Sequence, residues 1–250
     1  MFWQAILIIL ILNFLGFLYA WFKQSDKGTD LIYNVTFLVL AIIFYIQSEQ
    51  NILTLTLTIM ISLWALRLGA YLFWRIHKTD KDDRFDDIRV RISSLLNFWM
   101  LQTVSIFIIS IPAIIFYSKP ASEWGLNHSI GLVVWALGFV IESVADYQKT
   151  VFKSKPANKC KFMQSGLWSI VRYPNYTGEI MCWIGVFIFC SNIFVGWQWI
   201  AIVSPIWIAT LLIFISGIPL LEKSYEKKYA SMPSFQKYVK NTSRLIPGIY

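Results

Sequence analysis

Residues 2–22 read FWQAILIILILNFLGFLYAWF, a mainly apolar stretch that contains no charged side chain. A helix needs about 20 such residues to cross the hydrocarbon core of a bilayer. The stretch lacks a basic start, its apolar run is too long for a signal peptide, and no small-residue cleavage site follows it. It is therefore predicted to be a transmembrane helix that the protein retains.

Further apolar stretches of similar length occupy most of the remaining chain. Apolar residues make up 57% of the 250 residues, only 14% are charged, and the mean hydropathy is +0.57, far from the balance of a soluble domain. No linker, repeat or low-complexity tract interrupts the chain, so residues 1–250 are expected to form a single all-α transmembrane domain. The seven predicted spans are residues 2–22, 31–46, 52–76, 97–117, 130–152, 176–196 and 197–220.

The basic residues are distributed unevenly between the two sides of these spans. Lys and Arg near helix ends stay on the cytoplasmic side of a membrane. Seven spans place 20 of the 22 Lys and Arg residues on one side, with Lys119 on the other side and Arg67 inside a span. This pattern predicts an outside N-terminus and a cytoplasmic C-terminus. The membrane is expected to be a bacterial inner membrane or the endoplasmic reticulum. Contacts with anionic headgroups account for most individual loop lysines.

The predicted orientation can be tested with reporter fusions. A reporter fused after Tyr250 is expected to be cytoplasmic, and one fused before Met1 is expected on the opposite side, because the basic residues favour that orientation. Reporters that give the same side for both ends would contradict the seven-span topology.

Ionisable residues inside the predicted spans are candidates for function. A charged group at mid-membrane costs about 2.5–3.5 kcal/mol on insertion scales, so its presence needs a reason. Five stand out: Arg67, Glu142, Asp146 and Glu179 lie inside spans, and Glu222 lies two residues after the last one. The acidic residues at 142 and 146 share one helical stripe with Lys149 and Lys153. This stripe fits either a ligand-binding face or an internal ladder of salt bridges.

The most specific segment is SGLWSIVRYPNYTGE, residues 165–179. Pro174 ends the preceding structure and pre-sets the first turn of a new helix. Asn175 then lies near a helix N-terminus, where N–H groups and the helix dipole favour anions, and Glu179 follows on the same face. With Arg172 before the turn, the segment suits a phosphate near Arg172 and a ligand that carries an amide or hydroxyl group deeper in. A capped re-entry turn is the simpler interpretation, but it needs neither Arg172 nor Glu179.

Several chemistries are excluded by composition and motif. The two histidines, His77 and His128, are too few for a histidine-box di-iron enzyme, and no metal site is expected. Neither GxGxxG nor GxxxxGK[ST] occurs, so a Rossmann domain and a P-loop are absent, and any nucleotide must bind within a helical bundle. We expect no nucleic-acid partner.

Taken together, the motifs resemble the membrane-embedded steroid 5-alpha-reductase family, and within it a branch of short bacterial-type members. The resemblance covers roughly residues 60–250, and the RYPNYTGE block is its most specific part. The motifs follow the family's order: WALRLGAYLFWR (64–75), DKDDRF (80–85), ESVADYQKTVFK (142–153), SGLWSIVRYPNYTGE (165–179), YEKKY (225–229) and LIP (245–247).

The resemblance implies a seven-helix fold with NADPH in a cavity that opens to the cytoplasm. Lys153 and Arg172 also suit the extra phosphate of NADPH on physical grounds, since both are obligate donors on that side. At the reaction centre, Trp64 stands where the family has a tyrosine, three residues before Arg67. Arg67 and Tyr71 are the catalytic candidates, with Tyr71 as the substitute proton donor. The cofactor-binding candidates are Asp146, Lys149, Lys153, Arg172, Asn175, Tyr176, Glu179, Tyr225 and Tyr229.

Three functions remain open at this point. The first is an NADPH-dependent reduction of a carbon–carbon double bond in a lipophilic, steroid- or isoprenoid-like substrate that enters from the membrane lipid. The second is a membrane methyltransferase that uses S-adenosylmethionine, because isoprenylcysteine and phospholipid methyltransferases carry a similar R-[HY]-P-x-Y-x-G-E turn. A transporter or a scaffold would explain buried charges but not this turn.

Overall fold

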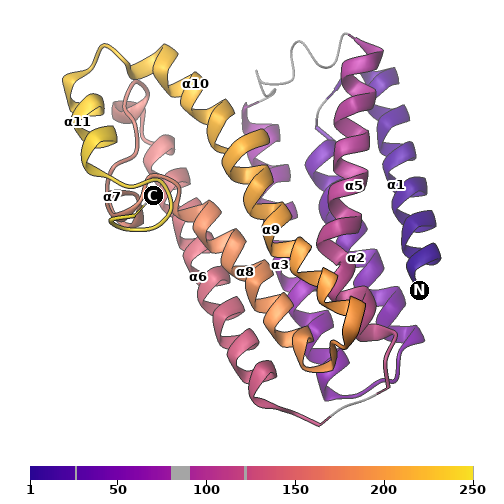
Figure 1. The fold of residues 1–250 in the computed structure, drawn as a ribbon. Helices are drawn as coiled ribbons and strands as arrows, with labels where there is room; N and C mark the ends of the chain where they lie inside the picture. The colour runs from indigo at the N-terminus through magenta and orange to yellow at the C-terminus, as the bar shows by residue number, and fades with distance from the viewer. Residues whose placement is uncertain (26, 80–90, 121–122, 250) are drawn as a thin grey trace. The chain divides into compact units, whose positions relative to one another are not determined.

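The computed structural model describes residues 1–25, 27–79, 91–120 and 123–249, and helices account for 82% of it (Figure 1). The DKDDRF segment, residues 80–85, lies outside the described residues. The longer helices are α1 (Phe2–Lys23), α2 (Thr29–Gln47), α3 (Ile52–Thr79), α5 (Ile92–Tyr117), α6 (Leu126–Ser154), α8 (Pro174–Cys190) and α10 (Ile218–Tyr229). The shorter helices and turns are η2 (Pro156–Asn158), α7 (Leu167–Ile170), η3 (Ser191–Ile193), η4 (Gly196–Ile202), α9 (Val203–Thr210), η5 (Leu211–Ile215) and α11 (Pro233–Asn241).

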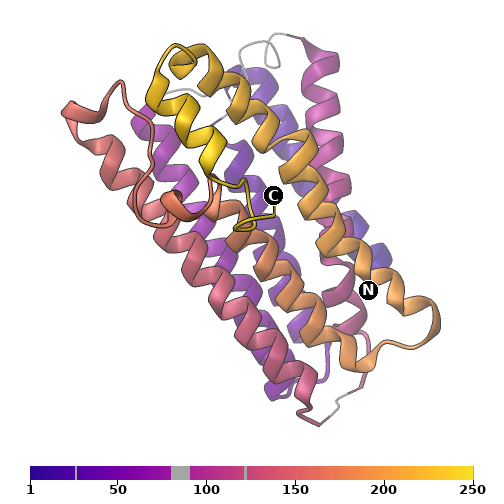
Figure 2. The same ribbon diagram turned by 60° about the vertical axis from the view of Figure 1, so that its left-hand side comes forward.

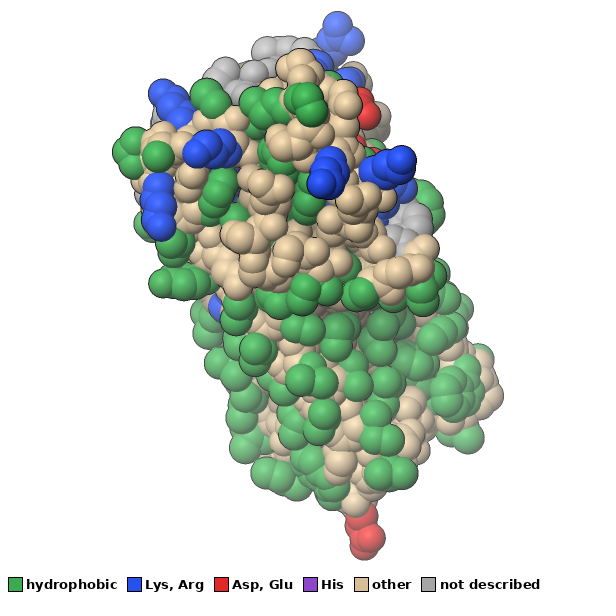
Figure 3. Space-filling view, turned by 90° about the vertical axis from the view of Figure 1, so that its left-hand side faces the viewer, with side chains coloured by type: hydrophobic (Ala, Val, Ile, Leu, Met, Phe, Trp, Pro, Cys, Tyr) green, Lys and Arg blue, Asp and Glu red, His purple; other side chains and the backbone are tan. Residues whose placement is uncertain are grey.

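Among the residues that the structure describes, seven helical segments are long and apolar enough to cross a membrane, as the sequence predicts. They are Phe2–Lys23, Thr29–Gln47, Ile52–His77, Ile92–Tyr117, Leu126–Ser154, Pro174–Ile193 and Gly196–Tyr229. Many large apolar side chains point outward, and Figure 3 shows them in green on one face of the molecule. Phe14, for example, is 60% exposed. An outward apolar surface is expected where lipid is the solvent. The protein is therefore a multi-pass membrane protein of the all-α class, and the orientation of its termini stays a prediction.

By internal contacts, the described chain divides into two compact units. Unit 1 comprises Met1–Leu132 and Val186–Trp207, and unit 2 comprises Val133–Gly185 and Ile208–Tyr250. Each unit is built from segments that lie far apart in the sequence. Whether the chain behaves as the single domain expected from its sequence stays a prediction.

Unit 1 is held together by polar and aromatic contacts between its helices. Gln102 of α5 donates from Nε2 to Oδ1 of Asn13 on α1, at 2.9 Å. The hydroxyls of Thr58 on α3 and Tyr117 on α5 lie 2.7 Å apart. Hydrogen bonds of this kind join helices in lipid, where apolar contact alone gives little driving force.

Trp64 on α3 is part of this packing. Its ring meets Phe37 of α2 edge to face, with the centroids 5.3 Å apart, and it is 1% exposed. Tyr33 of α2 packs on the same ring at 6.4 Å. The residue at the place of the family tyrosine is therefore an aromatic core residue of unit 1.

Unit 2 contains the most specific motif, and its central feature is the crossing of α6 and α8 (Figure 2). The two helices approach closely at Gly138 and Gly178, where an added Cβ atom on Gly178 would lie 2.6 Å from the carbonyl oxygen of Gly138. Small residues at such a crossing let two backbones come together. The crossing brings the backbone of Glu142 next to the glycine of the RYPNYTGE block.

Candidate functional site

The segment before α8 is attached to α6 by two side chains. Gly166 adopts a positive φ of 64°, which glycine tolerates without strain, and the next backbone N–H, of Leu167, donates to Oε1 of Gln148 at 3.0 Å. Trp168 is 2% exposed and donates from its indole Nε1 to the carbonyl oxygen of Ala145 at 3.1 Å. These bonds fix the start of the motif against the C-terminal part of α6.

The end of the chain pairs with the same motif. The backbone N–H of Arg172 donates to the carbonyl oxygen of Ser243 at 2.8 Å, and that of Tyr173 donates to the carbonyl oxygen of Arg244 at 3.0 Å. The hydroxyl of Thr177 donates to the carbonyl oxygen of Leu245 at 2.9 Å. The LIP motif is therefore fastened to the turn that opens α8, which explains how two motifs distant in sequence meet.

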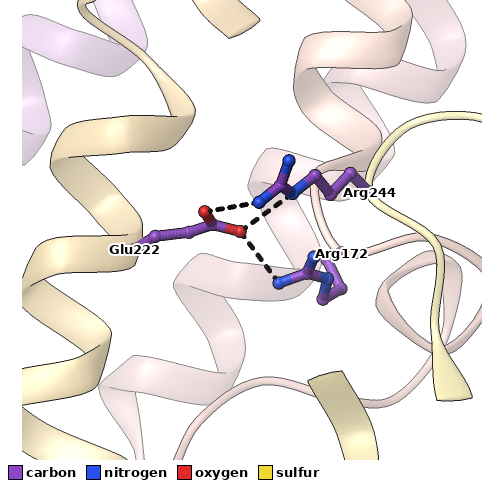
Figure 4. Close-up of polar contacts among 3 residues, drawn as sticks. All are labelled: Arg172, Glu222 and Arg244. Carbon is purple, nitrogen blue, oxygen red and sulfur yellow. Dashed lines mark hydrogen bonds and ion pairs between the residues drawn. The ribbon is translucent and has the colours of Figure 1, made fainter. Parts of the chain in front are cut away.

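This pairing brings two arginines onto one carboxylate (Figure 4). Arg172 donates from Nη1 to Oε1 of Glu222 at 3.0 Å. Arg244 donates from Nε to Oε1 at 3.1 Å and from Nη2 to Oε2 at 3.0 Å. The Arg172 side chain is only 12% exposed and that of Glu222 is 25% exposed, so water screens these charges less than it screens surface charges.

A pocket in unit 2 opens beside this cluster. Its walls combine the two arginines and their shared carboxylate with aromatic rings, a mixture of charged and flat surfaces that suits a polar ligand with a planar group. The lining residues are Phe162, Met163, Trp168, Arg172, Tyr173, Glu222, Tyr225, Glu226, Phe235, Tyr238, Val239 and Arg244.

Two of the predicted cofactor residues line this pocket, and two more contact its walls. Arg172 and Tyr225 are lining residues. The ammonium group of Lys149 lies 4.5 Å from the Trp168 ring centre and 5.9 Å from that of Tyr225, so it faces two π-systems. The ring of Tyr229 packs on that of Tyr225, with the centroids 5.8 Å apart.

At the start of α8, two buried polar atoms have no hydrogen-bond partner among the described residues. They are Oδ1 of Asn175 and Nε of Arg172. Because α8 begins at Pro174, as the sequence predicts, Asn175 lies in its first turn. A buried polar atom that lacks a partner costs about 1–3 kcal/mol, so both atoms are suited to a ligand that would pair with them.

The predicted stripe on α6 changes from buried to exposed along the helix. Glu142 is 1% exposed and Asp146 is 4% exposed, whereas Lys153 is exposed near the C-terminal end of the helix. Glu179, on α8, is partly buried, as is Tyr176, whose ring stacks on that of Tyr173 at 5.9 Å. All nine cofactor candidates belong to unit 2.

The catalytic candidates Arg67 and Tyr71 belong to unit 1. Both lie on α3, where Arg75 stacks over the ring of Tyr71 with 5.9 Å between the guanidinium carbon and the ring centre. Arg75 also lies 3.9 Å from the carboxylate of Asp30 on α2. The part of Arg67 and Tyr71 in catalysis stays a prediction.

Two phenols of the pocket are held in their neutral form. Burial raises the pKa of Tyr173 well above its usual value, and the nearby carboxylate of Glu222 raises it further. Burial likewise raises the pKa of Tyr238, whose hydroxyl donates to the carbonyl oxygen of Trp168 at 2.6 Å. Both side chains therefore remain uncharged hydrogen-bond donors at neutral pH.

Three parts of the site were not identified from the sequence. Arg244 precedes the LIP motif and gives no periodic signal, because its contact with Glu222 depends on the pairing of the chain end with Arg172 and Tyr173. The sequence indicates Glu222 as a charged residue beside the last predicted span, but it does not indicate that Glu222 lines the pocket, because its contact with Arg172 joins residues far apart in the chain. The apolar side of α11, with Phe235 and Tyr238, also lines the pocket.

A comparison with known protein families identifies the family of this chain. A family model described as a protein of unknown function, DUF1295, matches residues 16–242, and this family includes steroid 5-alpha-reductase-like members. The Probable O-methyltransferase ustE of Ustilaginoidea virens is 47% identical over 47 residues, which are 19% of this chain and 16% of that protein. No solved structure matches the chain. Since residues 16–242 make up most of its 250 residues, the chain belongs to the DUF1295 family.

Proposed function

We propose that this protein is a membrane-embedded, NADPH-dependent reductase of a carbon–carbon double bond in a lipophilic substrate. The observation that carries the proposal is the start of α8, where Arg172 and Asn175 each keep a buried polar atom without a partner among the described residues. One is a donor and the other is an acceptor, and they are three residues apart. A ligand that carries both a phosphate and an N–H group satisfies both, and NADPH is such a ligand.

The residues of unit 2 fit this cofactor by their chemistry. The Nε–H of Arg172 would donate to a phosphate oxygen, and a guanidinium is well suited to that task because it cannot lose its charge. Oδ1 of Asn175 would accept from an amino group of the cofactor, with Glu179 one turn further along α8. When bound, NADPH supplies the hydride that reduces the substrate.

The catalytic candidates would act on the substrate. The guanidinium of Arg67 would orient or polarise it, and the hydroxyl of Tyr71 would supply the proton that completes the reduction. A lipophilic substrate can reach a protein of this kind from the surrounding lipid, which the exposed apolar side chains of its helices contact.

A second candidate is a methyltransferase that uses S-adenosylmethionine. The observation that favours it is the short match to a protein named as an O-methyltransferase. A pocket with aromatic rings beside Glu222 and Glu226 would also suit a ligand that carries a sulfonium and an ammonium group. Binding of NADPH, NADH and S-adenosylmethionine to the detergent-purified protein separates the two candidates, since binding of S-adenosylmethionine without NADPH would contradict the reductase.

The phosphate side of the proposed site predicts the effect of two substitutions. Arg172→Ala is expected to weaken NADPH binding by about 1.5–3 kcal/mol, the contribution of a hydrogen bond to a charged group. Lys153→Ala should weaken it less, because Lys153 is exposed and its charge is screened. Both are measured by titration of the purified protein, with the exposed Lys159→Ala as the control. If NADPH binds and Arg172→Ala leaves its affinity unchanged, the phosphate does not lie at Arg172.

A further inference from the structure

In the cluster of Arg172, Glu222 and Arg244, two guanidiniums share one carboxylate. Arg172 carries five N–H groups, and its single hydrogen bond to Glu222 uses one of them, while its buried Nε has no partner among the described residues. These three side chains together carry one net positive charge. Glu226 also lines the pocket, but it is exposed, so solvent screens its charge.

The position of Arg244 is fixed by the backbone as well as by its side chain. Its carbonyl oxygen accepts from the N–H of Tyr173 at 3.0 Å, and its guanidinium forms a fork with both oxygens of Glu222. A guanidinium held in this way loses little further freedom when a ligand binds, which favours affinity. The segment Thr242–Leu245 therefore presents a preorganised cation to the pocket, next to that of Arg172.

Aromatic rings lie close to this pair of arginines. Trp168, Tyr225, Phe235 and Tyr238 all line the same pocket. Flat rings of this kind stack on a nucleotide base. The 2′-phosphate of NADPH is a phosphate monoester on the ribose that carries the adenine, and NADH lacks it. A pocket that combines two guanidiniums with several rings thus matches the adenosine 2′-phosphate end of the cofactor.

We propose that Arg172 and Arg244 together hold the 2′-phosphate of NADPH, so that the C-terminal segment Thr242–Leu245 is part of the cofactor site. Glu222 is then the positioning residue that keeps the two guanidiniums side by side. This inference rests on the proposed function. It adds that the adenosine end of the cofactor occupies the pocket, and that Arg244 selects NADPH over NADH.

The test compares the two nucleotides in the purified full-length protein. In Arg244→Ala the affinity for NADPH is expected to fall roughly 10- to 100-fold, the equivalent of a lost charged hydrogen bond, while the affinity for NADH changes by less than about threefold. Arg244→Lys should show an intermediate loss, because lysine keeps the charge but not the fork. Lys240→Ala, an exposed charge on α11, is the control and should leave both affinities unchanged.

A competition experiment distinguishes the 2′-phosphate from other anions. Adenosine 2′-phosphate is expected to displace NADPH from the wild type more strongly than adenosine 5′-phosphate, and this difference should disappear in Arg244→Ala. Phosphatidic acid added to the micelles carries a phosphate monoester without the base. If it displaces NADPH in an Arg244-dependent way and adenosine 2′-phosphate does not, the arginines hold a lipid headgroup and the inference is wrong.

The outcomes also separate this inference from the proposed function. A wild type that binds neither nucleotide contradicts both. A wild type that binds NADPH, with Arg244→Ala lowering the affinities for NADPH and NADH equally, contradicts the 2′-phosphate assignment and leaves the reductase standing. Thermal unfolding of each variant identifies a folding defect, and if Arg244→Ala fails to fold, Arg244→Lys carries the same comparison, because it can still pair with Glu222.

Discussion

Gly178→Ala is expected to destabilise the protein strongly, because the added methyl group has no space at the crossing of α6 and α8. Its Cβ would lie 2.5 Å from the backbone nitrogen of Glu142 and 2.6 Å from the carbonyl oxygen of Gly138. Both are backbone atoms, so no side-chain rotation relieves the overlap, and the helices must move apart. Overpacking typically costs about 1–3 kcal/mol, occasionally more, and we expect the upper end of this range.

The effect would be measured as thermal unfolding of the detergent-purified protein. Gly125→Ala is the matched control, since its Cβ would be in ordinary contact, 3.4 Å from Oδ1 of Asn192. A large loss of stability in Gly178→Ala, with little change in the control, supports the close crossing. Equal and small changes would show that α6 and α8 are further apart than the structure has them, and that Glu142 does not lie beside the RYPNYTGE turn.

The sequence predicted the membrane spans well because their physical cause is local. A stretch such as residues 2–22 must be helical in lipid, where each backbone group needs a partner within its own segment. The start of α8 at Pro174 was predicted for a similarly local reason, since the ring of proline fits the first helical turn. The predicted ends of the spans differ from the observed helix ends by several residues where a helix continues beyond its apolar stretch. The span predicted to begin at residue 97, for example, belongs to α5, which begins at Ile92.

The site was predicted only in part because its contacts are not local. Arg172 and Glu222 are 50 residues apart, and no period in the sequence connects them. Gly178 is visible in the sequence as part of the RYPNYTGE block. Its role as the point where α8 packs closely on α6 depends on Gly138, which is on the other helix. Lys149 was assigned to a charged stripe, whereas the structure also places its ammonium group against the ring of Trp168.

Glu222→Gln is expected to loosen the attachment of the chain end to unit 2. A carboxamide keeps the shape of the side chain, but it loses the charge and replaces one acceptor oxygen with an NH2 group that faces a guanidinium donor. Arg172, at 12% exposure, is then left with little compensation for its charge. Breaking a fully buried pair costs about 3–5 kcal/mol, and because Glu222 and Arg244 are partly exposed we expect about 1–3 kcal/mol.

The matched control for this substitution is Glu226→Gln, one turn further along α10, where the side chain is exposed and no measurable loss of stability is expected. Thermal unfolding gives the stability, and limited proteolysis after Lys240 or Arg244 reports on the chain end itself. The three backbone and hydroxyl bonds to Ser243, Arg244 and Leu245 remain in Glu222→Gln, so cleavage should become faster without the loss of the whole fold. If the two variants unfold at the same temperature and are cleaved at the same rate, the carboxylate does not anchor the chain end, and the backbone pairing with Arg172 and Tyr173 is sufficient to hold Arg244 in place.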